Sequence, residues 1–114
     1  MSELVFVYGT LKEGFDNHIV MMESNGVLVS KPARMPYFNM YDQGYFPAAV
    51  CTDSKNDVIY GEIYSVDSLA PLDRLEGYPT HYDRVQVDTQ YGKVWVYVYA
   101  DPEGDLIASG QWTK

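Results

Sequence analysis

Residues 4–8 read Leu-Val-Phe-Val-Tyr, and Gly9 and Thr10 follow them directly. An apolar run this short, with no polar face, is typical of a strand buried on both sides at the centre of a sheet. The glycine lets the chain turn sharply, so that several backbone amides can point into one space. Such an array of amides can bind a carboxylate or an oxyanion. A plain turn is the alternative interpretation of the same residues.

The sequence on either side of this stretch predicts further short strands. Val58–Val66 reads VIYGEIYSV, whose β-branched and aromatic residues favour a strand, with Gly61 marking a bulge or a close backbone approach. Residues 82–90 and 93–100, joined by a turn with a glycine, predict a hairpin. Strands interrupted by prolines are also expected at 27–29, 35–41 and 48–51, and an edge strand at 106–112.

Residues 16–24 and 67–76 are expected to form short helices. In the second, Asp67 caps the start, three leucines fall on one face, and Gly77 ends the helix. Two helices beside about six strands are too few for alternating strand–helix units. The expected fold class is therefore α+β, a single domain over residues 1–114 with a curled, partly closed sheet.

Length and charge limit the kinds of function. The 114 residues suffice for one domain with a buried core, and 8 basic against 16 acidic residues give a net charge of −8. No two basic residues are adjacent, whereas nucleic acids and anionic membranes require clustered lysine and arginine. We therefore expect no nucleic-acid or membrane partner. With a single cysteine and no leader-like or membrane-spanning run, the chain is expected to be cytoplasmic.

Most familiar catalytic motifs are missing from the sequence. Residues 9–14 have the spacing of a phosphate-binding loop but lack the lysine and hydroxyl residue that complete it. His18 and His81 stand outside metal-ligand spacings, Cys51 has no base beside it, and no serine lies in a nucleophile elbow. Structural or solvent-facing roles are expected for these residues, and no metal site is predicted.

Glu76 stands out among the carboxylates. It falls in the last turn of the expected helix, where the partial negative charge of the helix end opposes a carboxylate. Asp73 adds a like charge, and the flanking Leu75 and Tyr78 would exclude water. All three effects raise the pKa of a carboxyl toward the range useful for proton transfer. The alternative is an ordinary surface glutamate.

Glu62 is a rival for the same role. It shares its strand face with apolar and aromatic residues, which would also exclude water. Arg84 lies on the same face of the next strand as Tyr82 and offers a cation with which Glu62 would pair. Such an ion pair would make Glu62 structural.

Short distinctive segments follow one another along nearly the whole chain. They are VFVYGTLK at 5–12, Gly14 with Asn17-His18, FPAAV at 46–50, VIYGEIY at 58–64, LDRLEG at 72–77, YDR at 82–84, the aromatic strand at 94–99 and SGQW at 109–112. In this order they resemble the gamma-glutamylcyclotransferase family, and especially the gamma-glutamylamine cyclotransferase-like proteins. The resemblance implies a small mixed β-barrel of about six strands flanked by short helices.

The resemblance also implies a cofactor-free reaction on a small γ-glutamyl substrate. In the family, the glutamyl α-amine attacks its own γ-carbonyl, a 5-oxoproline ring closes, and the amine on the far side leaves. Carried over to this chain, the loop of Tyr8, Gly9, Thr10 and Leu11 would hold the glutamyl group through backbone amides. Glu76 would take a proton from the α-ammonium and deliver one to the departing nitrogen.

The side of the site that would bind the leaving amine is less defined. Tyr82 and, more weakly, Tyr99 are candidates for pocket lining, and the loops at 40–46 and 78–81 are expected to build the amine side. A γ-glutamyl-lysine isopeptide, a γ-glutamyl amino acid and a γ-glutamylated small amine all stay open as substrates. The alternative functions are a non-catalytic module of the same fold that binds a carboxylate, or an interaction protein with a tyrosine-rich surface. We expect a monomer or a weak dimer.

Overall fold

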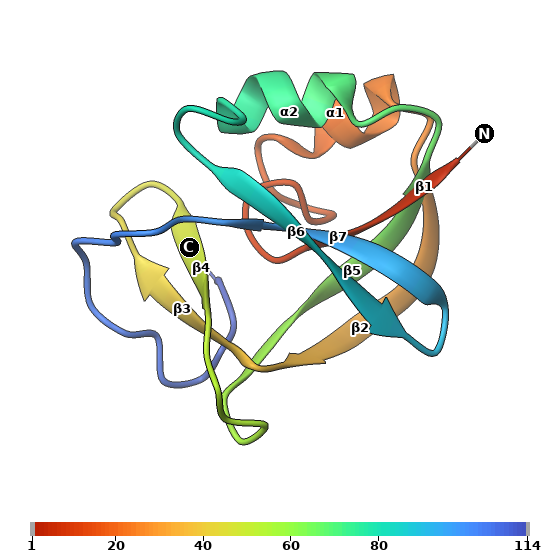
Figure 1. Ribbon diagram of the computed structural model, residues 1–114. Coiled ribbons are helices and arrows are strands. Elements are labelled where there is room, and N and C mark those ends of the chain that lie inside the picture. Colours follow the sequence, from red (N-terminus) through yellow and green to blue (C-terminus); the bar gives the residue numbers. More distant parts are fainter. Residues whose placement is uncertain (1, 114) are drawn as a thin grey trace.

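The computed structural model describes residues 2–113. A five-stranded sheet curls around the main core, a two-stranded sheet flanks it, and two short helices lie side by side at one end (Figure 1). The elements in chain order are β1 (Glu3–Val7), α1 (His18–Glu23), β2 (Val27–Pro36), β3 (Phe38–Asp42), β4 (Pro47–Cys51), β5 (Val58–Val66), α2 (Ala70–Glu76), β6 (Asp83–Thr89) and β7 (Gly92–Val98).

β1 occupies the centre of the larger sheet, whose strand order is β2-β5-β1-β7-β6. It runs antiparallel to β5, with Val7 opposite Glu62, and parallel to β7, with Phe6 opposite Val96. Val5, Phe6 and Val7 are all buried, because both faces of a central strand are covered. The prediction of a central buried strand is confirmed, and so is the mixed α+β fold class.

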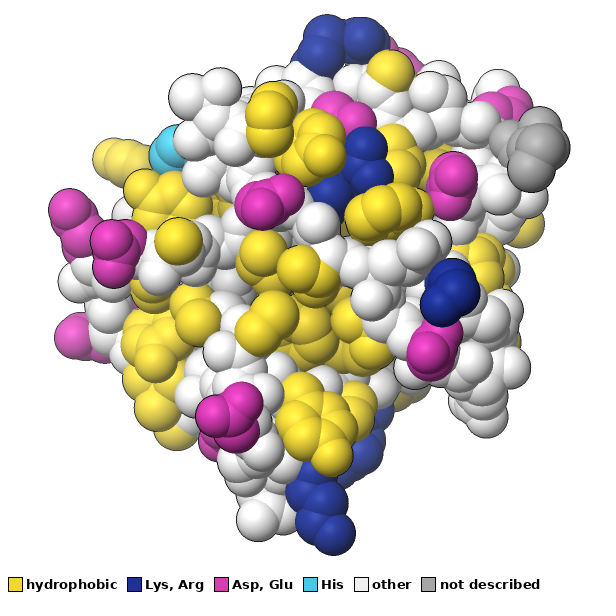
Figure 2. All heavy atoms as spheres, in the orientation of Figure 1, with side chains coloured by type: hydrophobic (Ala, Val, Ile, Leu, Met, Phe, Trp, Pro, Cys, Tyr) yellow, Lys and Arg dark blue, Asp and Glu magenta, His cyan; other side chains and the backbone are white. Residues whose placement is uncertain are grey.

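The two faces of β1 pack into separate hydrophobic clusters. Phe6 joins the cluster inside the curled sheet, together with Met35 and Val96. Val7 joins the cluster on the other face, together with Leu72 from α2. Figure 2 shows that hydrophobic side chains also gather across the centre of the visible surface, with charged side chains scattered around them. The cluster that contains Val7 and Leu72 attaches α2 to the sheet and holds the C-terminal end of the helix near the end of β1.

The curled sheet stays open along one side. Among the described residues, the edge strands β2 and β6 do not pair with each other. A hollow of about 390 Å³, lined by residues of both strands, lies between them. The expected barrel is therefore only partly closed.

Prolines interrupt the strands less than the sequence predicts. The segments 27–29 and 35–41 were expected as two strands, but β2 runs through Pro32 and ends at Pro36. Its pairing with β5 is irregular between Ser30 and Ala33, so the missing N–H of Pro32 falls where the ladder is already broken. The chain changes sheets at Tyr37 instead, which has φ 72°.

Helix α2 starts later than expected and without its expected cap. The N-cap position falls on Leu69, two residues after Asp67, and the Asp67 carboxylate accepts the Asn25 amide at 2.8 Å. The Ser68 hydroxyl instead accepts the Ala70 N–H at 3.1 Å. Gly77 ends the helix in the left-handed region, with φ 68°, as predicted.

The C-terminal segment covers the core without adding the expected edge strand. Within residues 2–113, only an isolated bridge joins Leu106 to Tyr41. The Tyr60 N–H donates to the Gly110 carbonyl at 2.8 Å, and Trp112 is buried in the main cluster. No helix in the described part of the chain is long and apolar enough to cross a membrane.

Gly61 provides a test of how closely β5 and β1 approach. A Cβ at this position would collide with the carbonyl oxygen of Val7. This oxygen belongs to the backbone and cannot move without disturbing the pairing of β1 with β5. We expect Gly61→Ala to lower the free energy of unfolding in urea by about 1–3 kcal/mol or more, as overpacked cores do. Ser65→Ala on the same strand is the control and should change it far less. An unchanged midpoint for Gly61→Ala would contradict the close approach.

Candidate functional site

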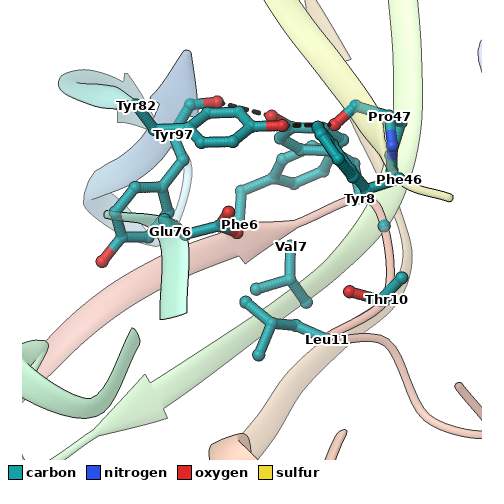
Figure 3. Close-up of a pocket in the computed structure, with 11 residues that line it drawn as sticks. Phe6, Val7, Tyr8, Thr10, Leu11, Phe46, Pro47, Glu76, Tyr82 and Tyr97 are labelled. Atoms are coloured by element: carbon teal, nitrogen blue, oxygen red, sulfur yellow. Dashed lines mark hydrogen bonds between the residues drawn. The ribbon is translucent and has the colours of Figure 1, made fainter. Parts of the chain in front are cut away.

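A small pocket opens where β1 ends and meets the C-terminal end of α2. We call it the inner pocket, and it encloses about 30 Å³. Figure 3 shows Glu76 reaching it from α2 and Thr10 from the segment after β1. It brings together Tyr8, Gly9, Thr10, Leu11, Glu76 and Tyr82, which were predicted for the site, but not the weaker candidate Tyr99. Its lining consists of Phe6, Val7, Tyr8, Gly9, Thr10, Leu11, Phe46, Pro47, Glu76, Tyr82 and Tyr97.

The loop after β1 presents three backbone amides without partners. Within residues 2–113, the N–H groups of Gly9, Thr10 and Leu11 donate to no acceptor in the protein. The loop is held from its other side, because the carbonyl and the hydroxyl of Thr10 accept hydrogen bonds from the backbone and side chain of Asn17 at 3.0 and 2.8 Å. Three free amides lining one pocket are suited to binding a carboxylate or an oxyanion.

Gly9 is required by packing as well as by access to the pocket. A Cβ at this position would lie 2.7 Å from the Cγ of Pro47, which is closer than carbon atoms approach. A larger residue would therefore push the loop away from β4, whatever it does to a ligand. Weaker ligand binding by a Gly9 variant would consequently indicate a displaced loop before it indicated a direct clash with the ligand.

The tyrosines of the pocket use their hydroxyls within the protein. The Tyr8 hydroxyl donates to the Tyr97 carbonyl at 2.7 Å and accepts the Ala49 N–H at 3.2 Å. The Tyr82 hydroxyl donates to the Pro47 carbonyl at 2.9 Å, and Figure 3 shows this bond and the one from Tyr8 to Tyr97 as dashed lines. Burial raises the pKa of both phenols, so they stay neutral donors. Tyr8 and Tyr82 therefore line the pocket mainly with their rings.

Glu76 contributes a carboxyl group without a protein partner. It is the last residue of α2 and is half-buried, and among the described residues no donor reaches its carboxylate. Burial raises the pKa of Glu76 to about 7, because the charged form loses hydration. A carboxyl group with this pKa can both accept and return a proton near neutral pH.

Burial alone accounts for the raised pKa of Glu76, because the like charge of Asp73 is compensated. Asp73 accepts the Tyr97 hydroxyl at 2.6 Å and two Arg84 N–H groups at 3.0 and 3.3 Å. Leu75 is 38% exposed and Tyr78 lies against the Arg84 guanidinium, so they shield Glu76 less than expected.

The prediction of an ion pair between Glu62 and Arg84 is wrong. Glu62 lies on β5 and Arg84 on β6, which are separated by β1 and β7 in the sheet. Glu62 instead accepts the Glu13 N–H at 3.0 Å and the Tyr64 hydroxyl at 2.8 Å. It lines another hollow, beside Lys12 and Lys31, and does not face the inner pocket. Glu62 therefore ties the loop after β1 to β5.

A second, larger hollow adjoins the inner pocket. This outer pocket measures about 180 Å³ and shares Thr10, Phe46, Glu76 and Tyr82 with the inner one. Its remaining lining residues are Asn17, Leu75 and His81. The loops at 40–46 and 78–81 contribute Phe46 and His81. Tyr99 does not line either pocket, but its ring packs 5.1 Å from that of His81 and 5.3 Å from that of Tyr82.

The sequence did not identify Pro47 and Tyr97 as site residues. The aromatic face of the strand at 94–99 was visible, but the pairing of β7 with β1 decides which aromatic residue reaches the pocket. Among the described residues, no group of three histidine, cysteine or acidic side chains is arranged to hold a metal ion.

Comparison with known proteins identifies the family. Residues 5–114 match the family model described as gamma-glutamyl cyclotransferase, AIG2-like. A relative from Vibrio cholerae serotype O1 is 38% identical over 118 residues, which span 100% of this chain and 98% of the relative. The solution structure of ytfP from Escherichia coli has a TM-score of 0.74 and 33% identity, covering 97% of this chain and 96% of that one. A crystal structure of an AIG2-like protein from Mus musculus has a TM-score of 0.69 and 30% identity, covering 87% and 78% of the two chains. The chain therefore belongs to the AIG2-like gamma-glutamyl cyclotransferase family.

Proposed function

We propose that this protein is a cyclotransferase that converts a γ-glutamyl amine or γ-glutamyl amino acid into 5-oxoproline and a free amine. The observation that carries the proposal is the unpartnered Glu76 carboxyl, with a pKa of about 7, in the same pocket as three free backbone amides. Membership in the family supports the same reaction class.

In the proposed complex, the amides of Gly9, Thr10 and Leu11 hold the glutamyl group through its α-carboxylate. No lysine or arginine lines the inner pocket in the described chain, so the amides are the donors suited to that charge. The nucleophile and the electrophile belong to one molecule. The enzyme therefore needs to hold a folded conformation of the substrate and to move protons, without a covalent intermediate on the protein.

The proton transfers are assigned to Glu76. Its ionised carboxylate takes one proton from the α-ammonium, which frees the nitrogen lone pair to attack the γ-carbonyl carbon. A new C–N bond closes the five-membered ring, and the bond from that carbon to the leaving nitrogen breaks. The leaving nitrogen gains the proton that Glu76 returns and a second one as the ring nitrogen becomes an amide N–H.

The direct test is incubation with a panel of γ-glutamyl compounds, with 5-oxoproline detected by mass spectrometry. Production of 5-oxoproline supports the cyclotransferase. Saturable binding without turnover would support the alternative, a non-catalytic carboxylate-binding module, and would overturn the proposed reaction.

Replacing Glu76 tests its role as acid and base. Glu76→Gln keeps the shape of the side chain but cannot exchange a proton near neutral pH. We expect the turnover rate to fall by roughly a hundredfold to ten-thousandfold, as for the loss of one general acid–base group. Steady-state kinetics with the best compound of the panel measures the loss, and circular dichroism verifies that the variant is folded.

Glu62→Gln is the matched control for this experiment. Glu62 lines a separate hollow, so its replacement should affect the rate far less, and mainly through the loop that it anchors. A folded Glu76→Gln protein with parental turnover, beside an inactive Glu62→Gln protein, would move the catalytic role to β5.

The raised pKa of Glu76 also predicts how stability depends on pH. Between the ordinary value of 4.5 and about 7, the folded protein binds a proton at Glu76 that the unfolded chain has lost. This contribution is therefore fully present below pH 4.5 and is lost as the pH rises to 7. We therefore compare the free energy of unfolding of Glu76→Gln with that of the parent, measured in urea. The difference in favour of the variant should be about 1–3 kcal/mol larger at pH 8 than at pH 5. Equal differences at both pH values would show that the pKa of Glu76 is close to its ordinary value.

A further inference from the structure

The outer pocket gives the leaving group its own binding site. The inner pocket, at about 30 Å³, has room for only a few atoms, whereas the outer pocket has about 180 Å³. A γ-glutamyl compound must therefore extend from one into the other past Glu76, which lines both. If the proposed cyclisation holds, the carboxylate end lies against the amides of the inner pocket. The departing amine then lies in the outer pocket.

The wall of the outer pocket is largely apolar and aromatic. The His81 ring lies 5.1 Å from the Tyr82 ring and 6.1 Å from the Phe46 ring, both in edge-to-face arrangements. Leu75, at the end of α2, is 38% exposed and lines the same hollow. Rings and an alkyl side chain arranged in this way offer a surface for a hydrocarbon group.

Within residues 2–113, the one basic side chain that lines the outer pocket is the imidazole of His81. Among the described residues, no lysine or arginine lines it, and its acidic member is Glu76 itself. The half-buried Arg84 is held by Asp73 at 3.0 Å and lies between the rings of Tyr78 and Trp95, 4.3 Å from each centroid. A carboxylate on the leaving amine would therefore face the charge of Glu76 without a lysine or arginine to compensate it.

From this arrangement we infer that the outer pocket binds the leaving amine and selects uncharged alkyl or aryl amines over amines that carry a carboxylate. This inference rests on the proposed cyclotransferase function. It narrows the substrate class to γ-glutamylated apolar amines and sets γ-glutamyl amino acids aside. It assigns Leu75 and His81 as the residues that determine this specificity.

Two substrates that differ by one carboxylate test the inference. γ-Glutamyl-2-phenylethylamine and γ-glutamyl-phenylalanine have the same ring and the same linkage. We expect kcat/KM to be at least about tenfold higher for the phenylethylamine compound, because an unpaired carboxylate near Glu76 is repelled. γ-Glutamyl-methylamine, which lacks the ring, should also be a poorer substrate than the phenylethylamine compound.

A positive charge placed in the pocket should weaken the preference for the uncharged amine. Leu75→Lys adds a cation at a partly exposed helix position, where lysine is well tolerated. It should reduce the preference for the phenylethylamine compound by about threefold to fivefold, the effect of one exposed charge pair. Leu28→Lys on β2, which is 44% exposed and lines neither pocket, is the control and should leave the preference unchanged.

The outcomes separate the two proposals. Turnover of both compounds at equal rates, or faster turnover of the phenylalanine compound, overturns the specificity inference and leaves the cyclotransferase standing. If neither compound is turned over, calorimetric binding of both to the parent protein decides. Tighter binding of the phenylethylamine compound supports the assigned pocket, whereas equal binding or no binding overturns the specificity inference. The panel of γ-glutamyl compounds decides the reaction separately.

Discussion

The buried hydroxyl of Tyr8 is the contact on which the site depends. It donates to the Tyr97 carbonyl and accepts the Ala49 N–H, so one group joins the end of β1 to β7 and to β4 of the second sheet. Burial raises its pKa and keeps it protonated, which preserves both bonds at any ordinary pH. The next residues, starting at Gly9, leave this anchored point and form the wall of amides. The loop is thus positioned by a core contact before any ligand arrives.

A second set of contacts places Glu76 opposite that loop. Asp73 lies one turn before Glu76 in α2. Its carboxylate accepts hydrogen bonds from Arg84 of β6 and from the Tyr97 hydroxyl of β7. Leu72 of the same helix is fully buried against the sheet. These contacts fix the helix end, so that the Glu76 carboxyl can stay without a partner of its own. Leaving a carboxyl unpaired in a half-buried position lowers stability, and the rest of α2 offsets that loss.

The sequence predicted the elements better than their boundaries. The apolar run of β1 was sufficient to identify a buried strand, because both of its faces had to be covered, and the β-branched and aromatic residues of β5 were sufficient to identify a strand. Pro32 was misleading, since a break in the pairing of β2 accommodates it without ending the strand. The tail was misleading too, because Trp112 reaches the core from a segment that needs no ladder of hydrogen bonds. Such outcomes depend on neighbours that are distant in sequence.

By itself, the sequence determined the chemistry that the site can contain. It supplied a strand end with a glycine, a glutamate at a helix C-terminus, and an order of segments that identifies the family. Only the tertiary structure decided which carboxylate stays unpaired, because the fold gives Glu62 the Glu13 N–H and the Tyr64 hydroxyl as donors and brings no donor to Glu76 among the described residues. It also decided that Leu75 and His81 share a pocket with Glu76. The physical reason is that all the chain segments packed around a group set its hydration. Hydration in turn sets the pKa of a carboxyl and the polarity of a pocket. Residues adjacent in sequence supply only some of those segments.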